Sequence, residues 1–142
     1  MIAGLASLIF IPLLAVSMVH LMWAFGSTWP VSDPQTLART VVGAKDIQRM
    51  PSRLMTGLVA IAVLAAGIWA LAMTDPSDSP ILTWGGVALA LVFVGRGIAG
   101  FTRAWRAMVP EEPFATFDRK LYSPLCLAIG VGFVTLVIWR LA

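Results

Sequence analysis

Four long segments of the chain are almost free of charge, and they constrain the fold more than any other feature. A helix of about 20 mostly apolar residues crosses the hydrocarbon core of a bilayer, and none of these segments has the period-two alternation of a strand. We therefore expect an all-α integral membrane protein, with residues 1–142 forming a single four-helix transmembrane bundle. The expected spans cover residues from about 2 to 25, 54 to 73, 81 to 100 and 122 to 139, and only the third contains a charged residue, Arg96.

The composition excludes several other classes of protein. Hydrophobic residues make up 59% of the chain and charged residues 12%, whereas a soluble domain has about a quarter of its residues charged. So few charges cannot cover a soluble domain, and they do not suit a disordered chain or a nucleic-acid-binding arm. One cysteine and one histidine exclude an intramolecular disulfide, a paired-cysteine redox centre and a two-histidine metal or haem site. We expect no metal, no cofactor and no nucleic acid.

The basic residues predict the orientation of the bundle. Nine of the ten lie in or beside the connections 26–53 and 101–121, whereas the connection 74–80 has only acidic charges and the C-terminal end has Arg140. Basic residues concentrate on the cytoplasmic side of membrane proteins. This distribution predicts an up-down topology, with inner loops at 26–53 and 101–121 and both termini outside the cytoplasm. The six tryptophans, three near each expected interface, agree with it.

Shorter patterns predict the connections and the helix contacts. Asp33 and Pro34 form a cap and a first-turn proline, which predicts a short helix on the membrane surface that Gly43 ends. Two prolines downstream predict that the third helix ends near Met108. The short connection 74–80 can join only antiparallel neighbours. Small residues four apart, which allow close helix contact in lipid, form the rows Ala62-Ala66-Ala70, Gly86-Ala90, Gly95-Ala99 and Ala128-Gly132.

Three polar side chains inside the expected spans are candidates for a ligand-binding site: His20, Arg96 and Cys126. Each lies six or seven residues from the expected inner boundary of the membrane, on the order of 10 Å deep at 1.5 Å per residue. They therefore reach one level on three different helices, in the cytoplasmic half. Further candidates lie just below this level, at Trp23, Trp29, Asp118, Tyr122 and Ser123.

Each of these three side chains has a functional and a structural interpretation. An arginine inside a span is costly unless it finds a partner. Arg96 could bind a substrate anion or a lipid phosphate, or it could snorkel to the headgroups or pair with Asp118, the nearest carboxylate. His20 could relay a proton or make a structural hydrogen bond. Cys126 could be a nucleophile or a small packed residue.

Several short motifs resemble those of a family of small bacterial membrane proteins. They are His20-Leu21-Met22-Trp23-Ala24, Thr28-Trp29-Pro30, Thr40-Val41-Val42-Gly43 and, most specific, Tyr122-Ser123-Pro124-Leu125-Cys126-Leu127. On these motifs the chain is similar, over most of its length, to the family called domain of unknown function 3995. The resemblance implies four spans in the inner (plasma) membrane of a bacterium, and it implies no established activity and no catalytic residue.

Two classes of function fit these observations. The first is the binding or movement of a small anionic or lipid-like ligand in a polar pocket in the cytoplasmic half, with Arg96 at the anion and His20 as a hydrogen-bond or proton partner. The second is a non-catalytic accessory or scaffold subunit, whose basic inner face docks a membrane protein, a second copy of the chain or anionic membrane lipid. An enzyme ranks third.

Overall fold

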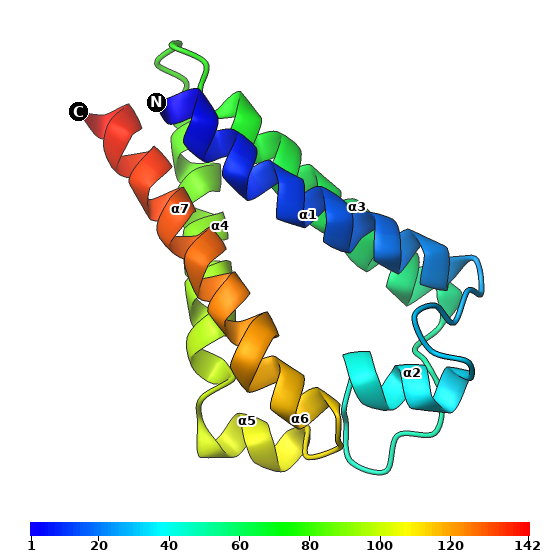
Figure 1. Cartoon of the computed structure of the whole chain (residues 1–142). Helices are drawn as coiled ribbons and strands as arrows, with labels where there is room; N and C mark the ends of the chain where they lie inside the picture. Colours follow the sequence, from blue (N-terminus) through cyan, green and yellow to red (C-terminus); the bar gives the residue numbers. More distant parts are fainter.

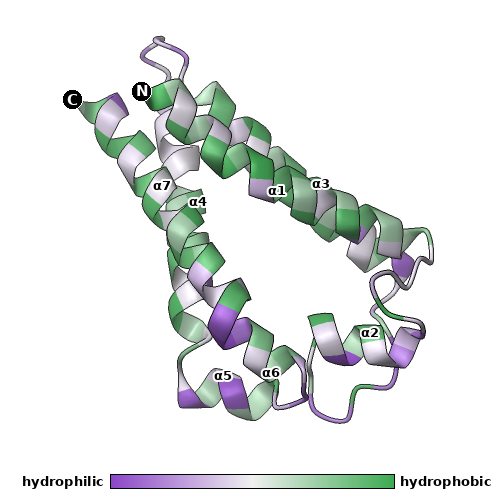
Figure 2. Cartoon of the chain, in the orientation of Figure 1, coloured by the Kyte–Doolittle hydropathy of each residue, from purple (hydrophilic) through white to green (hydrophobic).

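The computed structural model describes residues 1–142 and contains helices and no strands (Figure 1). Its elements are α1 (Ile2–Ala24), α2 (Pro34–Val41), α3 (Arg53–Ala72), α4 (Pro80–Ala99), α5 (Arg103–Met108), α6 (Phe114–Phe117), the π-helical turn η1 (Asp118–Tyr122) and α7 (Ser123–Leu141). Four helices are long and apolar enough to cross a membrane: α1, α3, α4 and the continuous helix Phe114–Leu141. Figure 2 shows the apolar colouring that runs along them. The prediction of an all-α chain with four such segments is confirmed.

The four long helices form two hairpins. α1 packs along α3 and α4 packs along α7, while the two hairpins contact each other over a much shorter length. Figure 1 shows that the hairpins meet at the end that carries both termini and diverge toward the other end. We call the first the terminal end, which includes the connection 73–79. The second is the loop end, which includes the connections 25–52 and 100–113.

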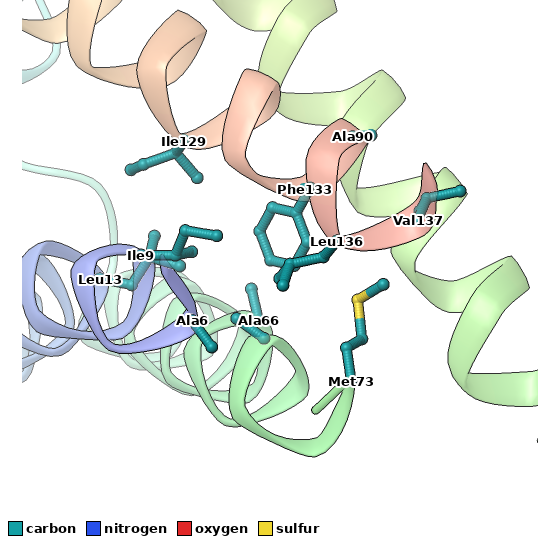
Figure 3. Packing of buried hydrophobic residues seen from close by; sticks show 11 residues of the cluster. Ala6, Ile9, Leu13, Ala66, Met73, Ala90, Ile129, Phe133, Leu136 and Val137 are labelled. Atoms are coloured by element: carbon teal, nitrogen blue, oxygen red, sulfur yellow. The ribbon is translucent and has the colours of Figure 1, made fainter. Parts of the chain in front are cut away.

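The hydrophobic core shared by the hairpins lies toward the terminal end, and Figure 3 shows how its side chains pack between the helices. Its members recur every three or four residues along α1 and α7, so they occupy one face of each helix. Phe133 of α7 is fully buried, and its ring stacks on Phe93 of α4 with 5.9 Å between the centroids. α1 contributes no buried member beyond Leu13, and α7 none before Ile129. The buried members are Ala6, Ile9, Leu13, Ala66, Ala70, Met73, Ala90, Ile129, Phe133, Leu136 and Val137.

Small residues bring the helix backbones close together, but not in every row that the sequence predicts. The rows on α3 and on the first half of α4 are buried at Ala66, Ala70, Gly86 and Ala90. Of the other two rows, Gly95 and Ala128 are exposed, whereas Gly132 is buried and faces Ile9 of α1. Gly97 and Gly130, two positions away, face the opposite helix so closely that a Cβ on either would collide with it. Because both helices are apolar on all sides, their sequence pattern does not mark which face packs.

Arg140 holds the terminal end together. Its guanidinium lies inside the connection 73–79 and donates to four backbone carbonyl oxygens, those of Met73, Asp75, Ser77 and Ser79. It also donates to the hydroxyl of Thr83 on α4. This side chain of α7 thus ties the second hairpin to the connection that joins α3 to α4.

The elements at the loop end agree with the sequence in one case and differ in another. The short helix α2 is confirmed, because Asp33 accepts a hydrogen bond from the Thr36 amide at 2.9 Å and Pro34 occupies the first turn. The third long helix does not end near Met108. It ends at Ala99, and the separate helix α5 begins after Thr102, whose hydroxyl accepts from the Trp105 amide at 3.2 Å. A threonine that caps a helix start in this way ends the preceding helix locally.

Candidate functional site

Arg96 and Asp118 form a buried ion pair between the two helices of the second hairpin. Arg96 Nη2 lies 2.6 Å from Asp118 Oδ1, and Arg96 Nη1 donates to Ser123 Oγ at 3.2 Å. The Asp118 side chain is only 2% exposed, and that of Arg96 is 29% exposed. An arginine within a membrane-spanning helix needs such a partner. The pairing with Asp118 is one of the alternatives that the sequence leaves open.

Trp105 of α5 completes this group. Its indole Nε1 donates to Asp118 Oδ2 at 2.9 Å, so both carboxylate oxygens have donors. Arg96 Cζ lies 4.5 Å from the centre of the indole ring, within the range of a cation–π contact. Trp105 therefore joins the short helix α5 to both charges. We call Arg96, Trp105, Asp118 and Ser123 the arginine cluster.

A π-helical turn positions two members of the arginine cluster. Between Asp118 and Ser123 the backbone makes an i→i+5 hydrogen bond, from the Ser123 amide to the Asp118 carbonyl. The wider turn places the two side chains on one face, where Ser123 Oγ donates to Asp118 Oδ1 at 3.1 Å. Pro124 follows directly and has no amide hydrogen, and its ring would crowd the carbonyl four residues earlier in a regular helix. The fourth long helix thus begins at Phe114 and not at Tyr122, and Pro124 lies within it.

Gly100 allows the arginine cluster to close. A Cβ at this position would collide with Ser123 Oγ, and it would lie 3.0 Å from Asp118 Oδ2. Neither Gly100 nor Trp105 is among the candidates from the sequence. A glycine after an otherwise apolar helix and a tryptophan between two arginines are signals too common to identify them. Pro124 is a stronger signal, because a proline inside a helix lacks the amide hydrogen of a regular turn and indicates irregular backbone.

His20, Trp23 and Trp29 form a second group, on the first hairpin. His20 Nδ1 lies 2.8 Å from the Val16 carbonyl oxygen, and its ring centroid is 4.9 Å from that of Trp23. Trp23 Nε1 donates to the Trp29 carbonyl at 2.7 Å. No hydrogen bond joins this group to the arginine cluster. The residues that the sequence places at one depth are therefore divided between the two hairpins.

Tyr122 and Cys126 continue along the same long helix as Asp118. The Tyr122 hydroxyl donates to the Thr40 carbonyl at 3.3 Å, so it bridges from the second hairpin to the connection that carries α2. Its ring lies 5.6 Å from that of Phe114. Cys126 is half-buried, one turn further on. All buried side-chain nitrogen and oxygen atoms have hydrogen-bond partners, so no buried polar side chain is left uncompensated.

Comparison with known proteins identifies one family. Residues 13–133 match the model of the family described as protein of unknown function, DUF3995. This range includes His20, Trp23 and Trp29, the whole arginine cluster and Cys126. The resemblance that the sequence motifs indicate is therefore confirmed. No curated protein and no solved structure matches the chain.

Proposed function

The chain therefore belongs to the DUF3995 family, and we propose that it binds a lipid-like amphiphile between its two hairpins. The bound molecule would lie in the half of the membrane next to the loop end. Its apolar chain would contact the faces of α1, α3 and α7 that point toward the opposite hairpin. Its polar group would lie near the arginine cluster, His20 and Tyr122.

The observation that carries this proposal is that the core shared by the two hairpins does not extend to the loop end. On α1, His20 lies two turns beyond the buried Leu13 and so on the same face. On α7, Cys126 lies one turn before the buried Ile129. Neither belongs to the core, and Figure 1 shows the hairpins diverging along this stretch. Within a membrane, an apolar helix face that has no protein partner lies against acyl chains.

The length of this stretch fits one leaflet of a bilayer. Ten residues separate Leu13 from Trp23, which corresponds to about 15 Å at 1.5 Å per residue. The hydrocarbon core of a bilayer is about 30 Å thick, so the stretch spans roughly half of it. An acyl chain of ordinary length fills this depth. A small water-soluble ligand would not need a site of this length.

The polar groups at the loop end also favour an amphiphile over a free anion. Asp118 balances the charge of Arg96, so little net positive charge is left for a free anion. The exposed 29% of the Arg96 side chain still leaves room for a hydrogen bond to a headgroup. Trp23 and Tyr122 have an apolar body and a polar tip, the type of side chain that lies at headgroup level.

The orientation of the chain is part of the proposal. The loop end carries nine of the ten basic residues and five of the seven acidic ones, a net charge of +4 from nine minus five. Basic residues favour the cytoplasmic side. We place the loop end in the cytoplasm, both termini outside it, and the chain in the inner membrane of a bacterium.

A second candidate function is docking through the basic face of the loop end. Of the nine basic residues there, only Arg39 and Arg96 pair with a carboxylate. The other seven are exposed. Unpaired positive charges of this kind attract anionic lipid or an acidic partner. This role needs no bound molecule between the hairpins, so the two functions are separable.

Native mass spectrometry of the purified protein tests the first candidate against the second. The variant Cys126→Trp fills the inward-facing side of α7, and Val131→Trp, on the 61% exposed side of the same helix, is its matched control. We expect the parent and Val131→Trp to retain one amphiphile and Cys126→Trp to lose it. Equal lipid retention by all three proteins, or none by the parent, would contradict the proposal and favour docking.

A further inference from the structure

We propose that the connection 25–52, which carries α2, is a latch that controls access of the amphiphile to the space between the hairpins. We call this segment the strap. The inference rests on the proposed function and adds its regulation. The strap belongs to the first hairpin and contacts the second at the loop end, where the long helices have diverged (Figure 1).

Backbone hydrogen bonds attach the strap to the segment between α5 and α6. The Lys45 amide donates to the Met108 carbonyl at 3.2 Å, and the Glu111 amide donates to the Gly43 carbonyl at 3.2 Å. These bonds join residues more than 60 positions apart in the sequence. They are the backbone bonds by which the first hairpin holds the second at this end.

The Glu111 side chain adds an ion pair and a hydrogen bond to the strap. Its Oε2 lies 3.1 Å from Arg39 Nη2, and its Oε1 accepts from the Asp46 amide at 3.2 Å. One carboxylate thus holds both α2 and the chain that follows it. The Arg39 side chain is 46% exposed, so water competes for this contact and it can open at little cost.

An apolar contact between α2 and α6 accompanies the polar contacts of Glu111. Phe114 is 4% exposed and Leu37 is 1% exposed. Gly43 has a φ of +65°, and a Cβ on it would collide with the Phe114 ring. Glycine is the residue that adopts this backbone conformation without strain and also leaves room for the ring. The close approach of the strap to Phe114 therefore depends on Gly43.

The hairpins thus meet in two zones of unequal strength. The terminal end has a core of 11 buried residues and the hydrogen bonds of Arg140 to the carbonyls of the connection 73–79. The loop end has the few, mostly polar, contacts of the strap. Because the weaker zone opens first, the terminal end acts as the pivot. Opening the strap separates the hairpins on the side where a headgroup must enter.

A pair of neighbouring glutamates provides the test. Glu111→Ala removes this carboxylate, and Glu112→Ala is the control because the Glu112 side chain bonds only to Thr116 of the following helix α6. Spin labels at Met22 and Leu121, which are 43% and 54% exposed, report the separation of the hairpins in lipid nanodiscs. All spin-labelled variants carry Cys126→Ala so that only the introduced cysteines are labelled. Exchange of bound fluorescent phosphatidylcholine is measured in the same glutamate variants without spin labels and with Cys126 kept.

We expect Glu111→Ala to broaden the distance distribution toward longer values and to make lipid exchange about five- to tenfold faster. Glu112→Ala should match the parent in both measurements. A lipid exchange rate that is unchanged in Glu111→Ala would overturn the latch and leave the proposed function intact. A parent that retains no phosphatidylcholine would overturn the proposed function and, with it, the regulatory role. In that case the distances would still measure whether the strap holds the hairpins together.

Discussion

Asp118 and Ser123 lie five residues apart, and the π-helical turn between them places the Ser123 hydroxyl 3.1 Å from the Asp118 carboxylate, beside the guanidinium of Arg96. A regular helix would instead bring Asp118 and Tyr122 to one face. The wider turn leaves Tyr122 free to reach Thr40 in the strap. One local irregularity therefore serves both the arginine cluster and the contact between the hairpins.

Removal of the Asp118 carboxylate should destabilise the protein. Asp118→Ala leaves Arg96 and Trp105 without their acceptor in a largely buried place, which we expect to cost about 1–3 kcal/mol of unfolding free energy. Thermal unfolding in detergent measures the change. Asp78→Ala is the control, because Asp78 is exposed on the connection 73–79 and makes no side-chain hydrogen bond, and it should leave the Tm unchanged.

The ion pair should show strong coupling between its two members. The double variant Arg96→Met/Asp118→Leu removes both charges, so no uncompensated charge is left in the span. We expect it to be more stable than Asp118→Ala by at least about 1 kcal/mol. Additive effects of the two single replacements on the Tm would mean that the pair contributes nothing as a pair.

A methyl group at Gly100 should disrupt the arginine cluster, whereas one at Gly95 should not. A Cβ at Gly100 collides with Ser123 Oγ, and a Cβ at Gly95 meets nothing within 4 Å. Gly100→Ala should lower the Tm. Gly95→Ala should leave it unchanged or raise it, since alanine favours a helix interior by about 0.5–1 kcal/mol over glycine. We thus expect the same substitution to lower the Tm at Gly100 but not at Gly95, five residues earlier.

The long helices could be predicted from the sequence, but their arrangement could not. Runs of about 20 uncharged residues specify a spanning helix regardless of its neighbours. The divergence of the hairpins depends on which faces pack, and helices that are apolar on all sides give no such pattern. Gly95 and Ala128 fit a small-residue row as well as Gly97 and Gly130 do, yet the second pair packs. Two residues at the same depth in the membrane can also lie on different sides of the bundle. His20 and Arg96 are such a pair, since they lie on different hairpins.

The arginine cluster could be predicted in part. Asp118 is the acidic residue nearest to Arg96 in depth, so the need of a membrane arginine for a partner identifies it. Trp105 lies in a short helix whose direction depends on where α4 ends, and the sequence predicts this end nine residues too late. Arg140, which the sequence suggests only as an outer charge, binds the connection 73–79 because the turn there exposes its carbonyls.

Replacement of Arg140 should loosen the terminal end. Arg140→Ala removes the guanidinium donors to the carbonyls of the connection 73–79, and we expect amide hydrogen exchange there to become about tenfold faster or more. Arg140→Lys keeps the charge but cannot reach four carbonyls at once. Its amide exchange rate should therefore lie between those of the parent and Arg140→Ala. Equal exchange in the three proteins would show that the turn is stable without this side chain.

The cap of α2 should respond to acid. Hydrogen bonds from the Thr36 side chain and backbone lower the pKa of Asp33 below its ordinary value of 3.8. A lowered pKa contributes stability that is fully present above 3.8 and is lost as the pH falls through the value in the folded protein. The protection of the Thr36 amide from hydrogen exchange should therefore decrease below about pH 4. Asp33→Asn keeps a capping side chain without a titrating group, so its protection should not change with pH over this range.

The most direct test asks what lies next to Cys126, the single cysteine of the chain. A ¹³C-methylthio group attached to its Sγ provides an NMR probe on the inward-facing side of α7 in lipid nanodiscs. We predict nuclear Overhauser effects from this methyl group to acyl-chain methylene protons and none to the methyl groups of Val16 on α1. Effects to Val16 with none to lipid would mean that the hairpins close on each other in the membrane, and would contradict the binding of an amphiphile between them.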